Sequence, residues 1–282
     1  MNAGREKYEN ISIPEGLGAA IDSGMRRASR RRVLRAVRRT AAGAAAAVCI
    51  LFAGANIMPV YSYAADIPVL GDIVRVFHVG SGGEVTDGAH AQGDAMDGKV
   101  EISFSTSDGA LTGAPAYSVE HLYAPNRIVL NLHGVRGADF DSIRESFLKS
   151  EAVSDVYRNM YLDDSAISLT VVLNDGWDYE ISEYAEPGTL IFGFTEAEQS
   201  EDEVYFLRSE AMPYGEQLGL MCEQYHAEGA SQVKTADGEY IVVIGQYASE
   251  EEALTALEAL NSQHGDTGLY VASGEANEVP EA

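Results

Sequence analysis

The sequence predicts a membrane-anchored α+β protein: a single transmembrane helix, then a mostly antiparallel β sandwich or barrel, then a smaller βαββαβ domain. Three observations support this fold class. Residues 40–65 carry no charged side chain, and Asp66 ends the run. Residues 99–195 alternate between apolar and polar side chains, which is typical of half-buried strands. After residue 203, two helical patterns fall among four strand patterns in the order β-α-β-β-α-β.

The N-terminal third predicts a single-pass plasma-membrane topology. Eight arginines lie between Arg26 and Arg39, directly before the uncharged run. A bilayer core needs roughly 20 apolar residues, and clustered arginines stay on the cytoplasmic side. We therefore expect a cytoplasmic basic segment at 1–39, a transmembrane helix at 40–62 and extracytoplasmic domains after it.

Net charge divides at the same point. Residues before Thr40 include ten Lys/Arg and four Asp/Glu, a net charge of +6. The residues from Thr40 onward include nine Lys/Arg and forty Asp/Glu, a net charge of −31. Nucleic-acid binding domains need basic patches, so the acidic part is not expected to bind nucleic acid. Its acidity is typical of a soluble surface.

A cleaved signal peptide is the alternative interpretation of the apolar run. Pro59 is expected to end the helix, and Ser62-Tyr63-Ala64 fits a small-x-small cleavage site. Thirty-nine residues precede the run, however, which is long for a signal peptide. A retained anchor is favoured, and cleavage after Ala64 stays open.

The cytoplasmic segment includes a short predicted helix that starts near Pro14, with an apolar stripe through Leu17, Ile21 and Met25. Together with the basic block, the single span and the Ile-Pro-Val-Leu-Gly segment at 67–71, it resembles the anchoring part of anti-sigma-factor-like proteins. The resemblance implies a sigma factor as a cytoplasmic partner. No cytoplasmic His/Cys cluster supports the zinc-containing subtype.

Residues 63–98 are expected to be a juxtamembrane segment and a flexible linker. Residues 67–79 are typical of a short amphipathic piece with Ile73, Val76 and Phe77 on one side. Residues 80–98 include six glycines and four acidic residues, a composition typical of flexible chain.

Residues 99–195 predict a compact antiparallel β domain. Seven strands are expected, with one short helix at 140–149 and an Asp175-Gly176 turn. The expected strands are 100–106, 117–123, 127–133, 153–162, 166–173, 178–184 and 188–194.

The pattern across YSVEHLYAPNRIVLNLHGV, VSDVYRNMYLDDSAISLTVVLN and DYEISEYAEPGTLIFGF resembles the AMIN domain, a β module of bacterial envelope proteins. Of that family's Arg-x-Gly-Gln element, only Arg158 is kept. The resemblance implies binding to peptidoglycan or an envelope complex and no catalysis, with Arg158 as a candidate contact.

Residues 196–203 are an expected acidic hinge, and residues 204–273 predict a ferredoxin-like βαββαβ domain. One helix is expected at 213–228 with Gly229 as its C-cap, and a second helix begins after Ser249, whose capping-box partner is Glu252. Residues 274–282 are expected to be a disordered acidic tail.

The segment YIVVIGQYASEEEALTALEAL resembles the SPOR domain, which binds septal peptidoglycan: Gly245, Tyr247, Ser249 and Ala253 occupy the family's Gly, aromatic, Ser and Ala positions. Strand parity places apolar side chains on the open sheet face, where a protein partner, a neighbouring domain or a sugar face would cover them. The candidate binding surface comprises Tyr205, Leu207, Ile241, Val243, Gln246 and Tyr247.

Catalytic and metal motifs are lacking. The six histidines are scattered without metal-ligand spacing, Cys49 and Cys222 form no disulfide framework, and no nucleophile motif occurs. His121 and His133 lie on neighbouring expected strands, which favours a solvent-facing pair. Trp177 either stacks on a sugar or packs in the core. No metal site and no cofactor are predicted.

The resulting hypothesis is a non-catalytic bacterial envelope protein that binds peptidoglycan glycan strands, or a wall- or division-associated protein, through its extracytoplasmic domains. The alternative is a transmembrane regulator that senses the envelope and binds a sigma factor. A cryptic hydrolase is a third class, and no motif supports it.

Overall fold

The computed structural model describes residues 72–162, 164–198 and 202–282, all within one compact unit. The expected transmembrane helix at 40–62, the basic segment before it and the centre of the acidic hinge lie outside the described residues. Within the described ranges, no helix is both long enough and apolar enough to cross a membrane.

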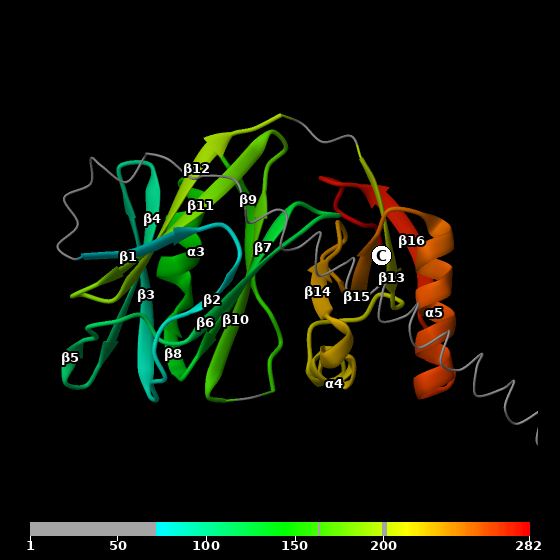
Figure 1. Cartoon of the computed structure of the whole chain (residues 1–282), viewed down its shortest axis with the longest axis horizontal. Helices are drawn as coiled ribbons and strands as arrows, with labels where there is room; N and C mark the ends of the chain where they lie inside the picture. The colour runs from blue at the N-terminus through cyan, green and yellow to red at the C-terminus, as the bar shows by residue number, and fades with distance from the viewer. Residues whose placement is uncertain (1–71, 163, 199–201) are drawn as a thin grey trace, which may run out of the picture. The chain divides into compact units, whose positions relative to one another are not determined.

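The first module, residues 72–196, is built from two mostly antiparallel sheets (Figure 1). The larger sheet has the strand order β1-β11-β12-β4-β3-β8, with β5 beside β4. Its strands are β1 (Asp72–Phe77), β3 (Ala89–Met96), β4 (Lys99–Thr106), β5 (Gly109–Ala110), β8 (Val135–Asp139), β11 (Trp177–Ala185) and β12 (Thr189–Glu196). Its β3–β8 pair is parallel.

The second sheet of this module has the order β2-β6-β7-β10-β9. Its strands are β2 (Gly80–Gly82), β6 (Tyr117–Leu122), β7 (Arg127–His133), β9 (Val153–Arg158) and β10 (Ala166–Leu173). Inward-facing residues of both sheets, such as Ile102, Leu130 and Ile181, belong to one buried cluster. The module is therefore a β sandwich with a single core, as the alternating pattern predicts.

Helix α3 (Phe140–Leu148) packs Ile143 and Phe147 into this core. Asp139 caps it by accepting a hydrogen bond from the backbone N–H of Ser142. The helix lies so close to β3 that a Cβ atom at Gly93 would stand 2.5 Å from the Cα atom of Ile143. Glycine at this strand position is what allows the contact.

The expectation of a flexible linker at 80–98 is wrong, because β2 and β3 lie there, and residues 72–77 form β1 instead of an amphipathic interfacial piece. Strand β3 alternates buried and exposed positions, and its buried side chains are small, namely those of Ala89 and Ala91. Small residues suit the close approach of α3, yet they give little hydrophobic signal, so the segment resembles a linker in sequence.

The second module, residues 203–282, has the expected βαββαβ order and a sheet of order β14-β15-β13-β16. Its elements are β13 (Glu203–Arg208), α4 (Glu216–Gln224), the 3-10 turn η2 (His226–Glu228), β14 (Ala230–Lys234), β15 (Tyr240–Tyr247), α5 (Glu250–His264) and β16 (Tyr270–Glu275). All its strand pairs are antiparallel. The arrangement is that of a ferredoxin-like unit.

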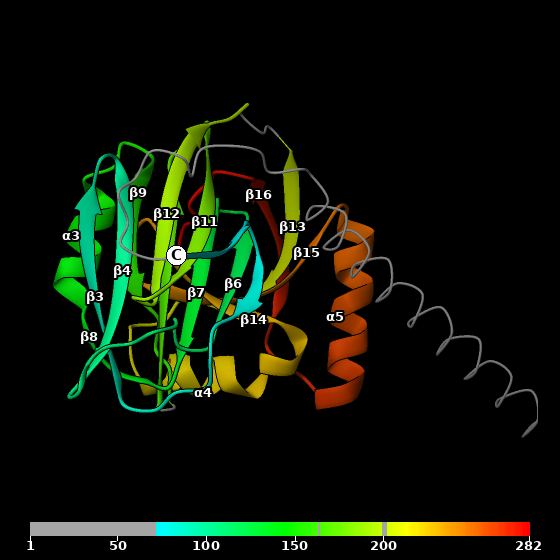
Figure 2. The ribbon, with the colours of Figure 1, turned by 60° about the vertical axis from the view of Figure 1, so that its left-hand side comes forward.

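The predicted N-cap at Ser249 is confirmed, whereas the expected helix at 213–228 is divided: α4 ends at Gln224 with Tyr225 as its C-cap, and Gly229 caps the separate turn η2. Gly229 has a left-handed φ of 80° after η2, and Ser249 accepts a hydrogen bond from the Glu252 N–H at the start of α5. Helix α5 runs beside β13 and β16 (Figure 2). Its residues Ala253 and Leu260 are buried. These contacts make the helix-covered face of the sheet the module's own core.

The C-terminal segment is ordered, contrary to expectation. Strand β16 extends to Glu275, and Ala276 is buried. Arg208 Nη1 donates to the Glu281 carbonyl over 2.9 Å, and the Ala236 N–H donates to the Pro280 carbonyl. Backbone acceptors near the end of the chain thus bind donors of β13 and the β14–β15 turn, which a composition-based interpretation does not reveal.

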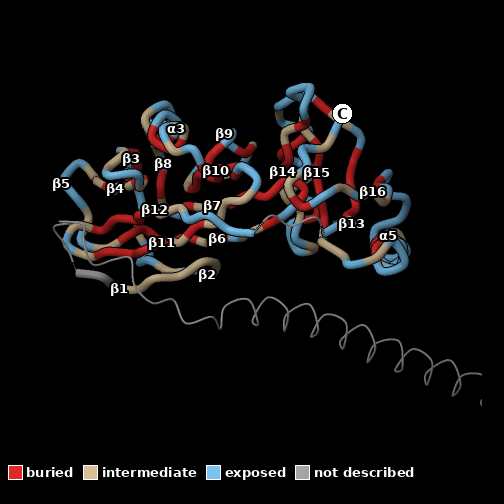
Figure 3. Tube along the Cα trace, turned by 90° about the horizontal axis from the view of Figure 1, so that it is seen from above, coloured by how far each residue is buried: buried red, intermediate tan, exposed pale blue. Residues whose placement is uncertain are grey.

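Strand β10 is buried at every position, although a strand of a two-layer sandwich usually exposes the side chains on the outer face of its sheet (Figure 3). The second module covers the outer side of its sheet. Tyr157 of neighbouring β9, for example, packs its ring against that of Tyr240, with centroids 5.9 Å apart. The two modules therefore share a buried interface within the described unit.

Candidate functional site

The predicted surface on the C-terminal sheet is divided between its two faces. Leu207 is 1% exposed and packs with Leu218 and Leu260 in the core beneath the helices. Tyr205 and Tyr247 are partly buried and pack against the same core. The expectation that Leu207 lies on the open face is wrong, because Phe206 faces that side of β13. Leu207 is thus a core residue, not a ligand contact.

Ile241 and Val243 do lie on the face away from the helices, but they are buried there with Phe206 and with Ala124 of the first module. Of the occupants considered from sequence, a neighbouring domain is the one found. A glycan-binding surface on this sheet face is therefore contradicted at Ile241 and Val243: their apolar side chains are removed from solvent within the chain itself.

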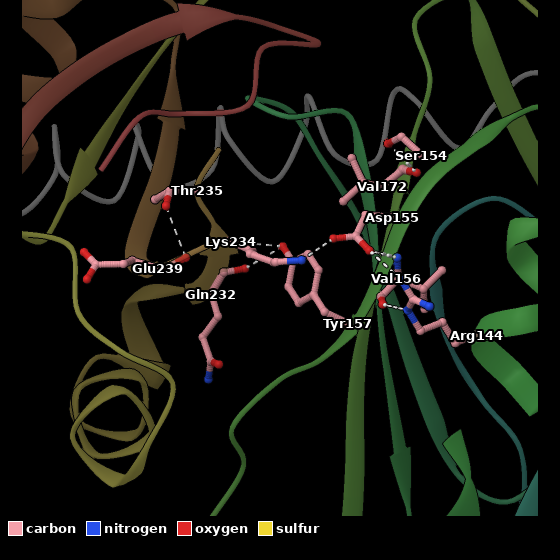
Figure 4. A network of polar contacts seen from close by, with 10 residues as sticks. All are labelled: Arg144, Ser154, Asp155, Val156, Tyr157, Val172, Gln232, Lys234, Thr235 and Glu239. Atoms are coloured by element: carbon pink, nitrogen blue, oxygen red, sulfur yellow. Dashed lines mark hydrogen bonds and ion pairs between the residues drawn. The ribbon is translucent and has the colours of Figure 1, made fainter. Parts of the chain in front are cut away.

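Polar contacts bind the two modules along β14. The Gln232 amide accepts from the Met160 N–H over 2.8 Å and donates to the Met160 carbonyl over 2.7 Å. Lys234 Nζ donates to Asp155 Oδ2 over 2.7 Å, and the Tyr157 hydroxyl accepts from the Lys234 N–H (Figure 4). These directional contacts fix the register between the modules. Strand β14 lies at the edge of its sheet, and residues of the first module cover that edge.

Arg158 is exposed at the end of β9, and no described contact connects it with the other predicted site residues. Gln246 and Trp177 instead meet the same turn of the first module. Gln246 Nε2 donates to the Tyr123 carbonyl over 3.1 Å, and Asn126 Nδ2 donates to the Trp177 carbonyl over 3.2 Å. The turn at residues 123–126 thus contacts both the Gln246 side chain and the Trp177 backbone carbonyl.

Beside this turn lies a group of three side chains that sequence analysis did not connect: His78, His121 and Asp178, named here the histidine cluster. His78 Nε2 stands 3.0 Å from His121 Nδ1 and 3.3 Å from Asp178 Oδ1. The three ligand atoms lie within 4.8 Å of one another. His78 follows β1, His121 is on β6 and Asp178 is on β11, so the cluster joins both sheets of the sandwich.

The hydrogen bonds of Asn126 set the tautomer of His121. Because Asn126 Nδ2 donates to the Trp177 carbonyl, its Oδ1 faces His121 Nε2 at 2.6 Å and must accept a hydrogen bond from the Nε2–H of that ring. The neutral imidazole then carries its hydrogen on Nε2 and a lone pair on Nδ1. That lone pair points into the cluster, toward His78.

The surroundings keep both imidazoles neutral near pH 7. Burial lowers the pKa of His121 to about 4, with the nearby His78 lowering it further and Asn126 opposing the shift. Burial also lowers the pKa of His78, against the attraction of Asp178. Neutral imidazoles can donate lone pairs, which is the state that metal coordination requires.

Aromatic rings enclose the histidine cluster. The Tyr179 ring lies edge-on to both imidazoles, with centroids 4.2 Å from that of His78 and 5.2 Å from that of His121. Its hydroxyl is buried and has no hydrogen-bond partner among the described residues. Tyr123, 36% exposed, packs its ring 4.8 Å from His121 and forms the solvent side of the site.

The expectation that the histidines are scattered is wrong for His78 and His121, and the reason is topological. The cluster's members come from three separate segments, and His78 lies in the part interpreted as a juxtamembrane piece. His121 was paired with His133, but His133 is exposed on β7. Only the pairing of β1 with β11, and of β2 with β6, brings the three side chains together.

No family model, no curated protein and no solved structure matches this chain.

Proposed function

We propose that this chain is a non-catalytic, membrane-anchored protein of the bacterial cell envelope whose extracytoplasmic modules bind peptidoglycan glycan strands. The observation that carries the proposal is the charge division: a net charge of +6 before the uncharged run and −31 from Thr40 onward. Such a division suits a chain whose basic end stays in the cytoplasm while the acidic remainder faces outward.

Because the open face of the C-terminal sheet is buried within the chain, we assign the contact surface to the turn at 123–126 instead. Tyr123 is 36% exposed there, Trp177 is half-buried, and the Gln246 side chain approaches from the second module. Exposed aromatic rings beside fixed polar groups are suited to stacking on the apolar face of a sugar ring.

Co-sedimentation of the full-length chain in detergent with purified wall sacculi tests this proposal. We expect saturable pelleting of the protein, retained on glycans stripped of stem peptides. Tyr123→Ala and Trp177→Ala should each weaken pelleting by roughly fivefold to tenfold, the worth of one aromatic contact. Tyr214→Ala removes an exposed tyrosine before α4 and serves as the matched control.

Absence of pelleting at every salt concentration would exclude wall binding. Capture of a sigma factor by the full chain, lost when residues 1–39 are deleted, would then favour the regulatory alternative. Pelleting that is unchanged in both aromatic variants would keep envelope binding and reject this surface.

A further inference from the structure

We propose that His78, His121 and Asp178 bind one divalent transition-metal ion of the Zn²⁺ type. The inference is independent of the envelope role, because it rests on three ligand atoms within 4.8 Å of one another. Two imidazoles and one carboxylate from separate strands form a ligand set that recurs in protein metal sites with an open position.

Two of the three distances between ligand atoms suit a tetrahedral ion, and the third, between His121 Nδ1 and a carboxylate oxygen of Asp178, is at most 4.8 Å and would shorten on binding. Zinc bonds imidazole nitrogen and carboxylate oxygen at about 2.0–2.2 Å, which places ligand atoms roughly 3.3 Å apart. The pair His78 Nε2 and Asp178 Oδ1 is separated by 3.3 Å, and the two imidazole nitrogens by 3.0 Å. An outward movement of a few tenths of an ångström by one ring would give the nitrogens the same separation.

Asn126 supplies an independent argument for ligation. Histidine ligands characteristically donate their second ring N–H to an oxygen that holds the ring in place. His121 Nε2 makes this contact with Asn126 Oδ1 over 2.6 Å, and Asn126 is itself held by the Trp177 carbonyl. The opposite nitrogen, Nδ1, is thereby left as an acceptor directed toward His78.

The donor set also selects the class of ion. Mg²⁺ and Ca²⁺ prefer six or more oxygen ligands, whereas this cluster offers two nitrogens and one carboxylate. No sulfur is present among the three, which removes the preference for soft Cu⁺. An ion bound here would have a fourth position, bordered by the rings of Tyr123 and Tyr179.

Such an ion would join three elements. His78 directly follows β1, the first described strand, while His121 and Asp178 belong to strands of opposite sheets. Coordination would therefore tie the N-terminal end of the unit to both layers of the sandwich. It adds a cross-link where His78 and Asp178 are otherwise partly open to solvent.

The test is titration of the EDTA-stripped full-length chain in detergent with Zn²⁺, by calorimetry, and with Co²⁺, by visible absorption. We expect saturation at one equivalent per chain and Co²⁺ ligand-field bands of a four- or five-coordinate site. His78→Ala and His121→Ala should each weaken binding by more than roughly 100-fold, since each removes a ligand.

Asn126 provides the sharper variants. Asn126→Ala should weaken binding by roughly 10- to 100-fold, whereas Asn126→Asp, which still accepts from His121, should retain it. His264→Ala is the matched control, because His264 Nε2 also stands near a carboxylate, that of Glu228 at 2.8 Å, but without a third ligand. Binding should be unchanged in that variant.

Absence of one-equivalent binding, or binding that survives His78→Ala and His121→Ala in folded protein, overturns the proposal. Circular dichroism establishes folding for each variant. Should the histidine variants fail to fold, X-ray absorption of the zinc-loaded native chain decides: scattering from two imidazoles supports the site, and its absence rejects it.

Discussion

Two polar clusters lie on the same three segments of the sandwich. Arg75, Tyr117 and Glu183 form one of them, named here the arginine cluster, and the histidine cluster is the other. Each takes one member from β1 or the residue after it, one from β6 and one from β11. The difference between them is whether the carboxylate is paired with a permanent cation.

The arginine cluster is closed. Glu183 is 6% exposed, and its Oε2 accepts from Arg75 Nε over 2.7 Å and from the Tyr117 hydroxyl. Arg75 Nη2 also donates to the Ser81 carbonyl over 2.7 Å, and the guanidinium lies 4.5 Å from the Phe77 ring centroid. A cation, an anion and a hydroxyl thus satisfy one another, and no position remains for a ligand.

The histidine cluster is open by contrast. His78 Nε2 and His121 Nδ1 share one hydrogen bond, and Asp178 Oδ1 accepts from the Tyr179 N–H, but no cation among the described side chains ion-pairs with Asp178 apart from His78 when protonated. The comparison shows that the boundary between the two sheets holds two different kinds of polar cluster. The arginine cluster contains its own cation, whereas the carboxylate of the histidine cluster depends on an external cation.

The largest expected effect comes from breaking the arginine cluster. Arg75→Met should lower the free energy of unfolding by about 2–4 kcal/mol, because it leaves the buried Glu183 carboxylate without its cation. Part of this cost is relieved by solvent, since the Arg75 side chain is 34% exposed. Urea unfolding in EDTA measures it.

Adding Glu183→Gln to Arg75→Met should restore about 1 kcal/mol or more, since the unpaired charge is removed. In the histidine cluster, the matched His78→Met change should cost less than about 1 kcal/mol without metal, because it separates no established ion pair. A double variant less stable than Arg75→Met alone would show that the carboxylate is not the origin of the loss.

The next-largest expected effect is a pH dependence of protein stability that arises from the histidine cluster. His121 has a pKa of about 4 when folded, against about 6.5 when unfolded, so the unfolded chain takes up the proton first as pH falls. Stability of the metal-free protein is therefore complete above pH 6.5 and declines between 6.5 and 4, by roughly 2–3 kcal/mol in all.

The charged and titratable groups around His121 are His78, Asp178 and Arg127, together with Tyr123 and Tyr179, whose rings pack against the imidazole. His121→Gln should flatten the decline between pH 6.5 and 4, whereas His133→Ala, which removes an exposed histidine on β7, should leave it unchanged. A decline of equal slope in all three proteins would assign the acid sensitivity to other groups.

Much of the fold follows from local pattern. The alternating strands from 99 to 195, the helix at 140–149 and the βαββαβ order after 203 all agree with the structure, because each reports on burial along its own segment. Strand β3 does not, since its buried face is built from Ala89, Ala91 and Gly93. Patterns of large apolar residues cannot identify a strand that packs through small ones.

The interface between the modules can be predicted in part from the sequence. The segment AISLTVVL ends in three consecutive apolar residues, which is typical of a strand covered on both faces, and β10 is covered in this way. Ile241 and Val243 similarly indicated a covered face, and one proposed cover was a neighbouring domain. What covers such a face depends on contacts between distant segments, which periodicity does not contain.

The candidate site was the least predictable part. His78 Nε2 and His121 Nδ1 belong to residues 43 positions apart and meet only because β1 pairs with β11 beside β2 and β6. No spacing motif marks such a site. A useful signal is the repeated arrangement itself: each of three short segments carries one member of the arginine cluster and one of the histidine cluster.

The smallest expected effect compares one tyrosine from each environment. Tyr117→Phe removes a hydroxyl that is bonded to Arg75 and Glu183, and should cost about 1 kcal/mol in metal-free protein. Tyr179→Phe removes a buried hydroxyl without a partner among the described residues, and should be neutral or stabilising by up to about 1 kcal/mol.

Repeating both measurements with saturating Zn²⁺ extends the comparison. The loss in Tyr117→Phe should be unchanged, because the arginine cluster is already complete. If the Tyr179 hydroxyl bonds to a water at the fourth metal position, the benefit of Tyr179→Phe should disappear when zinc is present. Equal stability changes with and without zinc would instead show that the Tyr179 hydroxyl contacts neither the metal nor its bound water. The buried hydroxyl would then destabilise the folded protein equally in both states.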